Sequence, residues 1–378
     1  MNTPTNHRTA ACHVAVALAA STSALALTAC GVTGSVVGSG SSASSKKGDG
    51  VSVGLLLPDR NTARFEKSDY PIFKKEVASL THGKGKVLYA NAEASTTTQA
   101  RQFQQMVHEK VDVIVVDPVD ARAIAPDVQK AEDAGIPVIA YDRLAQGPID
   151  AYVSHDNELV GQVQGRAIVE ALGSKAANSK IVMMNGDPAD PNTAQFKKGA
   201  LGELQGEVRI AKQYDTAKWS PAVAKADMKD AIRSIGMNNI AAVYSANDGM
   251  AGAVIGQLKK AGVTEMPPVT GQDANLDAVQ RIVSGEQYMT VYKSFLDEAD
   301  GAAQIAVDKV QGKDIQFDAL TRDTVDSPTT KKIPALLLPV VALTKANVKS
   351  TVVADGVYSV AEICTPEYEA SCAEIGLK

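Results

Sequence analysis

The stretch VSVGLLL (51–57) is a short apolar run, and three similar runs follow it: KVLYA (86–90), DVIVVD (112–117) and PVIAYD (137–142). Amphipathic segments with helical spacing separate the runs. Continuous Val, Ile and Leu runs of this length are typical of parallel strands that are covered on both faces. The alternation of strand and helix therefore predicts βαβ units with right-handed crossovers.

The same alternation starts again in the second half of the chain. Its predicted strands are KIVMMNG (180–186), EVRIAKQY (207–214), AAVYSAN (241–247) and PPVTGQD (267–273). In both halves a Gly that can end a helix precedes a strand that ends on Asp, at Asp142 and at Asp273. This internal repeat of the pattern predicts an α/β fold of two similar lobes, each with a parallel sheet.

Composition excludes several classes of protein. The 378 residues are 45% hydrophobic and 21% charged, as in an average soluble protein, and they allow two or three domains. The net charge of −5 argues against sequence-independent binding of nucleic acid. The four Cys and five His show no CxxC or HExxH spacing, and neither GxGxxG nor GxxxxGK[ST] occurs. We therefore expect no metal and no cofactor.

The first fifty residues carry a targeting signal. An uncharged run from Val14 to Ala29 is too short to span a membrane but suits the core of a signal peptide. It ends in LTAC (27–30), which resembles the lipobox of bacterial lipoproteins. We expect a signal peptide over 1–29, lipidation of Cys30, and a Gly/Ser-rich tether over 30–50 that holds the protein on the extracytoplasmic face of the membrane.

Export also bears on the two C-terminal cysteines. Cys364 and Cys372 lie eight positions apart, outside the reducing cytoplasm. We expect a structural disulfide between them that holds the tail, 361–378.

Polar side chains gather where the predicted strands end, which is where open parallel sheets bind ligands. These residues are Arg64, Asp142, Arg143, Asp190, Asn192, Asn247, Asp273 and Lys293. Carboxylates accept two hydrogen bonds, amides donate and accept, and guanidinium groups donate a fork, so together they suit a small polyol. Phe65 and Trp219 could stack on an apolar ring face. Taken singly, each Asp or Asn could instead cap a helix or form a turn, and Trp219 could be core.

Several motifs resemble those of one known family. They are Arg64-Phe65, AYDR (140–143), SHDNELVG (154–161), DPADPN (187–192), SANDGMAG (245–252), TGQDANL (270–276) and MTVYK (289–293). Over roughly 51–355 the chain resembles the type I periplasmic sugar-binding proteins of ABC importers, most of all those that bind D-xylose. The resemblance implies two Rossmann-like lobes, 51–154 plus 292–322 and 155–291 plus 323–360. It also implies a hinge that crosses near 154–157, 290–293 and 321–324.

The resemblance further implies a ligand set. Arg64, Asp142 and Arg143 would bond the sugar from the first lobe, where Phe65 stacks on it. Asp190, Asn192, Asn247 and Asp273 would bond it from the second lobe, with Trp219 on the opposite face and Lys293 reaching in from the hinge. The implied protein is a monomer that delivers the sugar to an ABC permease. Ribose, glucose or galactose, or a sensory role for the same fold, are the alternatives.

Two other classes fit the sequence less well. An enzyme would need a nucleophile with a base, but no GxSxG occurs and no Ser or Cys is paired with His82, His108 or His155. A sugar-responsive transcription regulator would carry a DNA-binding head where this chain carries a lipobox.

Overall fold

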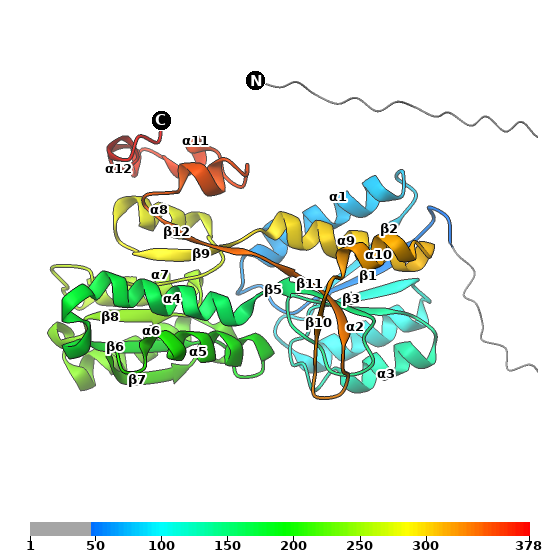
Figure 1. Ribbon diagram of the computed structural model, residues 1–378, viewed down its shortest axis with the longest axis horizontal. Coiled ribbons are helices and arrows are strands. Elements are labelled where there is room, and N and C mark those ends of the chain that lie inside the picture. Colours follow the sequence, from blue (N-terminus) through cyan, green and yellow to red (C-terminus); the bar gives the residue numbers. More distant parts are fainter. Residues whose placement is uncertain (1–46) are drawn as a thin grey trace, which may run out of the picture. The chain divides into compact units, whose positions relative to one another are not determined.

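The first lobe is built on a seven-stranded sheet in the computed structural model, which describes residues 47–378 (Figure 1). The strand order is β10-β11-β5-β4-β3-β1-β2, and every pairing is parallel except that of β10 with β11. The strands are β1 (Ser52–Leu57), β2 (Lys86–Asn91), β3 (Val113–Val116), β4 (Val138–Tyr141), β5 (Ala151–His155), β10 (Asp323–Val325) and β11 (Ile333–Leu338).

Helices cover both faces of this sheet. One face carries α1 (Tyr70–Leu80) and α9 (Phe295–Gln311), and the other carries α2 (Thr96–His108) and α3 (Ala125–Asp133). Successive side chains of a strand point to opposite faces, so Leu55 packs with α1 and α9 whereas Leu56 packs with α2 and α3. A π-helical turn, η1 (Phe65–Asp69), leads into α1, and α10 (Asp314–Leu320) follows α9.

The second lobe repeats this plan with a smaller sheet. Its strands are β6 (Lys180–Asn185), β7 (Arg209–Asp215) and β8 (Ala242–Ser245), which are parallel in the order β7-β6-β8, and the antiparallel pair β9 (Met289–Lys293) and β12 (Val340–Thr344). Its helices are α4 (Asn157–Leu172) and α5 (Pro191–Leu204) on one face, α6 (Pro221–Ile235) and α7 (Asp248–Lys260) on the other, and α8 (Leu276–Ser284). Short helical turns complete it: η2 (Gly173–Asn178), η3 (Ala217–Trp219), η4 (Met237–Asn239) and η5 (Lys349–Val353). The expectation of an α/β fold with two lobes is confirmed.

The predicted strand over 267–273 is not a regular strand. Only single bridges form there, Val269 with Val243 and Gln272 with Val291. Asp273, at its end, has a φ of +92°, which is outside the extended region. The bridges nevertheless join β8 to β9 and make the second sheet continuous.

The chain passes between the lobes three times, and the third passage corrects our prediction. The first two lie between β5 and α4 and between β9 and α9. The third lies at Leu338–Val340, not near 321–324, because β10 and β11 form a hairpin that extends the first sheet beyond β5. Residues 323–338 therefore belong to the first lobe. Their apolar run, IPALLL, would suit the edge of either sheet, so the sequence alone misplaced the boundary.

The C-terminal segment packs on the second lobe. It contains α11 (Val360–Ile363) and α12 (Glu369–Glu374), joined by a disulfide between Cys364 and Cys372. Cys372 and Leu377 share a core with Val279 and Ile282 of α8.

The predicted signal peptide (1–29), Cys30 and all but the end of the tether lie outside the described residues. Within 47–378, no helix has the length and apolar character that a membrane span requires.

Candidate functional site

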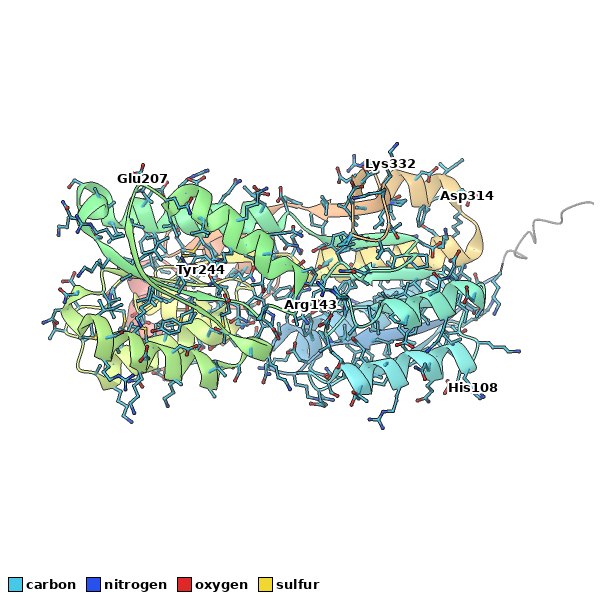
Figure 2. The ribbon with its side chains drawn as sticks, turned by 90° about the horizontal axis from the view of Figure 1, so that it is seen from below. His108, Arg143, Glu207, Tyr244, Asp314 and Lys332 are labelled. Carbon is cyan, nitrogen blue, oxygen red and sulfur yellow. A yellow bond between two sulfur atoms is a disulfide. The ribbon has the colours of Figure 1, made fainter. Side chains whose placement is uncertain are left out.

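All ten residues predicted as ligands line one cavity between the lobes. Thr62, Phe196 and Gln272 line it as well. The volume left free among these side chains is small, about 20 Å³. Figure 2 labels Arg143 at this junction between the lobes. The side chains that line the cavity therefore lie close together in this conformation.

The strand ends and helix starts of the second lobe place its cavity residues. Asp190 is the N-cap of α5, and its Oδ1 accepts a hydrogen bond from the Asn192 backbone N–H at 2.8 Å. Asn247 is the N-cap of α7, and its Oδ1 accepts from the Met250 N–H at 3.0 Å. Each side chain uses one polar atom for the cap and keeps the other near the cavity. The helix-capping role of these two residues is therefore compatible with their predicted role as ligands.

Arg64 is buried and enclosed by carboxylates. Its Nε and Nη2 donate to Asp69 at 2.8 and 2.9 Å, and its Nη1 donates to Asp142 Oδ2 at 3.0 Å. Nη2 also donates to Glu298 Oε2. Because a guanidinium has five N–H groups, one N–H on Nη1 is left for a ligand.

Three pairs of cavity residues connect the lobes directly. Asn192 Nδ2 donates to the Asp142 backbone oxygen at 3.0 Å and to its Oδ1 at 3.1 Å. Arg143 Nε lies 2.7 Å from Asp190 Oδ2. Lys293 Nζ lies 3.0 Å from Asp273 Oδ1 in its own lobe and 4.0 Å from Asp142 Oδ2 across the cavity. We call this conformation closed, because cavity residues of each lobe touch the other lobe.

The formal charges that line the cavity cancel. Arg64, Arg143 and Lys293 face Asp142, Asp190 and Asp273. Burial raises the pKa of Asp190 to about 6, although Arg143 opposes the shift. Burial also acts to raise the pKa of Asp142, but Lys293 and Arg64 outweigh it and the net shift is downward.

Further acids lie behind this layer. Asp117 is fully buried, and burial raises the pKa of its carboxyl well above the usual range, although Arg143 opposes the shift. Arg143 also lies 3.3 Å from Asp59 and 3.5 Å from Asp117. The Arg143 guanidinium therefore lies among three acidic side chains, Asp59, Asp117 and Asp190.

Aromatic side chains contribute the apolar part of the lining. The Arg64 and Arg143 guanidinium carbons lie 5.6 and 5.7 Å from the centre of the Phe65 ring. Trp219 meets Phe196 edge-on, with ring centres 6.3 Å apart, and its Nε1 donates to Asp190 Oδ2 at 3.1 Å. Aromatic rings as well as polar groups therefore line the cavity, a combination that suits a sugar.

A glycine makes room for the Trp219 ring. A Cβ added at Gly186, just after β6, would lie 2.1 Å from Trp219 Cη2. Only a residue without a side chain allows the tryptophan to occupy this position.

Three cavity residues were missed by the sequence analysis. Phe196 lies one helical turn after Asn192 on α5, and this spacing could have identified it. Gln272 directly precedes Asp273, and Thr62 lies two positions before Arg64. The Gln272 Oε1 and Asn192 Oδ1 atoms are buried and accept no hydrogen bond from any residue of 47–378. Such atoms can accept hydrogen bonds from a ligand.

Two α/β lobes, three connecting strands and a polar cavity between them define a binding protein that encloses a small molecule. A family model described as a periplasmic binding protein domain matches residues 53–314, and the chain belongs to this family, type I. The D-xylose-binding periplasmic protein of Haemophilus influenzae is 33% identical over 313 residues, which cover 81% of this chain and 90% of that protein. The protein of the same name from Escherichia coli is 32% identical, over 83% and 92% of the two chains.

A solved structure agrees with these relatives. The ABC transporter solute-binding protein of Clostridium phytofermentans with bound β-D-glucose superposes with a TM-score of 0.75 at 26% identity, over 82% of this chain and 99% of that one. The expectation that the chain is a binding protein and not an enzyme is confirmed by this family membership.

Proposed function

We propose that the protein binds a neutral monosaccharide, D-xylose, in the cavity between its lobes and delivers it to an ABC importer. The observation that carries this proposal is the lining itself, in which three cations, three carboxylates, three amides and three aromatic rings surround one small space. Amide and carboxylate groups match vicinal hydroxyls, and the cancelled charge favours a ligand without one. The relatives that are named for D-xylose support the choice of sugar.

The closed conformation suggests how binding works. A sugar that bonds groups of both lobes binds the closed state better than the open one, so it shifts the population toward closure. The sugar hydroxyls would compete with the direct contacts Arg143–Asp190 and Asn192–Asp142 for the same polar atoms. A permease that recognises the closed arrangement would then accept only the loaded protein.

A thermal-shift panel tests the identity of the sugar. D-xylose, D-ribose, D-glucose and D-galactose are each added to the protein. A ligand at one hundred times its dissociation constant stabilises the folded state by about 2.7 kcal/mol, which raises Tm by a few degrees. We expect the largest shift with D-xylose. A larger shift with a hexose would assign the same site to that hexose, and no shift with any sugar would contradict the proposal.

We also propose that Cys30 anchors the protein to the membrane through a lipid. The LTAC motif supports this proposal. In cells, the wild-type protein should sediment with membranes and the Cys30→Ser variant should not. Equal sedimentation of the two proteins would contradict the anchor and leave the sugar-binding proposal unaffected.

A further inference from the structure

The first turn of α9 contacts Arg64 in two ways. The Arg64 guanidinium carbon lies 4.4 Å from the centre of the Phe295 ring, and its Nη2 donates a hydrogen bond to Glu298 Oε2. Ser294 caps this turn through a hydrogen bond from the Asp297 N–H to its Oγ. Neither Phe295 nor Glu298 lines the cavity, so their direct contact with a cavity residue is the one with Arg64.

This turn also adjoins the hinge. α9 begins two residues after β9 ends at Lys293, where the chain passes between the lobes for the second time. His155, the last residue of β5 at the first passage, faces the same carboxylate with its Nδ1 3.6 Å from Glu298 Oε2. In the third passage, Leu338 is in register with His155 and Val340 with Lys293. Glu298 thus lies where the hinge strands meet the sugar site.

Polar atoms at this point are left without partners in the closed conformation. Glu298 Oε1 and both ring nitrogens of His155 are buried and form no hydrogen bond with the described residues. Buried polar groups of folded proteins nearly always have a partner. Unpaired groups beside a hinge therefore point to a role that packing alone does not provide.

We propose that Glu298 is a positioning residue for sugar binding. It fixes the Arg64 guanidinium between Asp69, Asp142 and the first turn of α9, so that the remaining Nη1 N–H points at the ligand. Because α9 starts at the second hinge passage, the position of Arg64 depends on the state of the hinge. This inference rests on the proposed function.

The charges around Glu298 predict a dependence on pH. The groups that face it are Arg64 and Asp69 at η1, Tyr141 and Asp142 at the end of β4, Tyr152 and His155 on β5, and Lys293 on β9. Burial raises the pKa of Glu298 to about 8, although Arg64 opposes the shift, so the closed form holds a proton on Glu298 at neutral pH. Opening the lobes admits water and weakens the effect of burial. The closed form then keeps the proton to a higher pH than the open form, so sugar affinity falls as pH rises toward 8.

Titration calorimetry with D-xylose at pH 6, 7 and 8 tests the proposal on the full-length protein. We expect Glu298→Ala to weaken binding roughly 10- to 100-fold, because Arg64 loses one of its fixed partners. Glu298→Gln should retain most of the affinity at pH 6, since its amide oxygen can accept from Arg64 as the protonated acid does. Its affinity should fall much less from pH 6 to 8 than that of the wild type, which should fall several-fold. Any change that remains comes from groups such as Asp190 that titrate in both proteins.

The control is Asp297→Asn, which removes an acid from the same helical turn but at an exposed position. It should bind like the wild type at every pH. The proposal is wrong if folded Glu298→Ala binds within twofold of the wild type, or if Asp297→Asn weakens binding as much.

If Glu298→Ala does not fold, the pH series on Glu298→Gln decides alone, and a profile equal to that of the wild type overturns the proposal. A wild-type protein that binds no sugar contradicts the proposed function and this inference with it. Wild-type binding together with unaffected Glu298 variants contradicts only the inference.

Discussion

Replacing Asp273 by Asn tests whether this residue, which pairs with Lys293 at the cavity, is a sugar ligand. Asp273 Oδ1 lies 3.0 Å from Lys293 Nζ, and both side chains line the cavity. Asn has the same shape and tolerates the φ of +92° at this position, so the substitution removes the charge and little else. A hydrogen bond to a charged group contributes about 1.5–3 kcal/mol. At 1.4 kcal/mol per factor of ten, D-xylose should bind roughly 10- to 150-fold more weakly.

The same substitution has a consequence for stability. Lys293 is 3% exposed, and without the Asp273 carboxylate its nearest remaining carboxylate is Asp142 at 4.0 Å. Complete removal of one partner of a buried ion pair destabilises a protein by about 3–5 kcal/mol. Because the Asn oxygen can still accept a hydrogen bond from Lys293, we expect Asp273→Asn to lower the free energy of unfolding by about 3 kcal/mol or less. Thermal unfolding should show a lower Tm with a cooperative transition.

The matched control is Asp277→Asn on α8. Its side chain is 64% exposed and pairs with Arg281, so it loses the same charge away from the cavity. Calorimetric titration should show wild-type affinity for this variant. Folded Asp273→Asn that binds D-xylose within twofold of the wild type would refute the assignment of Asp273 as a ligand.

Three further predictions follow from the lining and the C-terminal segment. Burial raises the pKa of Asp190 to about 6, so ionisation of this carboxyl lowers the stability of the wild type as pH rises from about 4 to 6. The Tm of Asp190→Asn minus the Tm of the wild type should therefore be more positive at pH 7.5 than at pH 4.5. A difference that is equal at the two pH values would contradict the raised pKa. Gly186→Ala should displace Trp219 and weaken sugar binding at least tenfold, whereas Gly202→Ala, where an added Cβ has no neighbour within 4 Å, should bind normally in the same titration. Cys364→Ser should lower the free energy of unfolding by roughly 2–3 kcal/mol. It should not change sugar affinity, because the disulfide packs on α8 and not at the cavity. An altered affinity would show that the C-terminal segment acts on the site.

Much of the fold could be predicted because parallel strands leave a strong mark on a sequence. The central strands β1, β3, β4 and β6 are mostly apolar because both faces of each sheet are covered, and the sequence placed them in nearly the same positions. The third hinge passage could not be predicted in the same way. Whether an apolar strand such as β11 joins one sheet or the other depends on long-range pairing, here with β5, which no local pattern records.

The cavity residues could be predicted at the strand ends but not behind them. Asp142 and Asp273 follow predicted strands, so topology brings them to the same edge. Glu298 is different, because it lies in the first turn of a helix. Acidic residues are common there because they interact favourably with the helix dipole, so its position in the sequence does not indicate a binding site. Asp117 ends a predicted strand, yet only the structure shows that its carboxyl is buried beside Arg143.

The central claim is that the cavity is built for a neutral sugar, and paired titrations with D-xylose and its acid D-xylonate test it most directly. D-xylonate carries a carboxylate at the carbon that closes the ring in D-xylose and is therefore an open chain, and the cations that line the cavity are already balanced by its own carboxylates. We predict one molecule of D-xylose bound per protein with micromolar or tighter affinity, about −8 kcal/mol, and no detectable binding of D-xylonate. No binding of D-xylose, or equal binding of the two, would contradict the account.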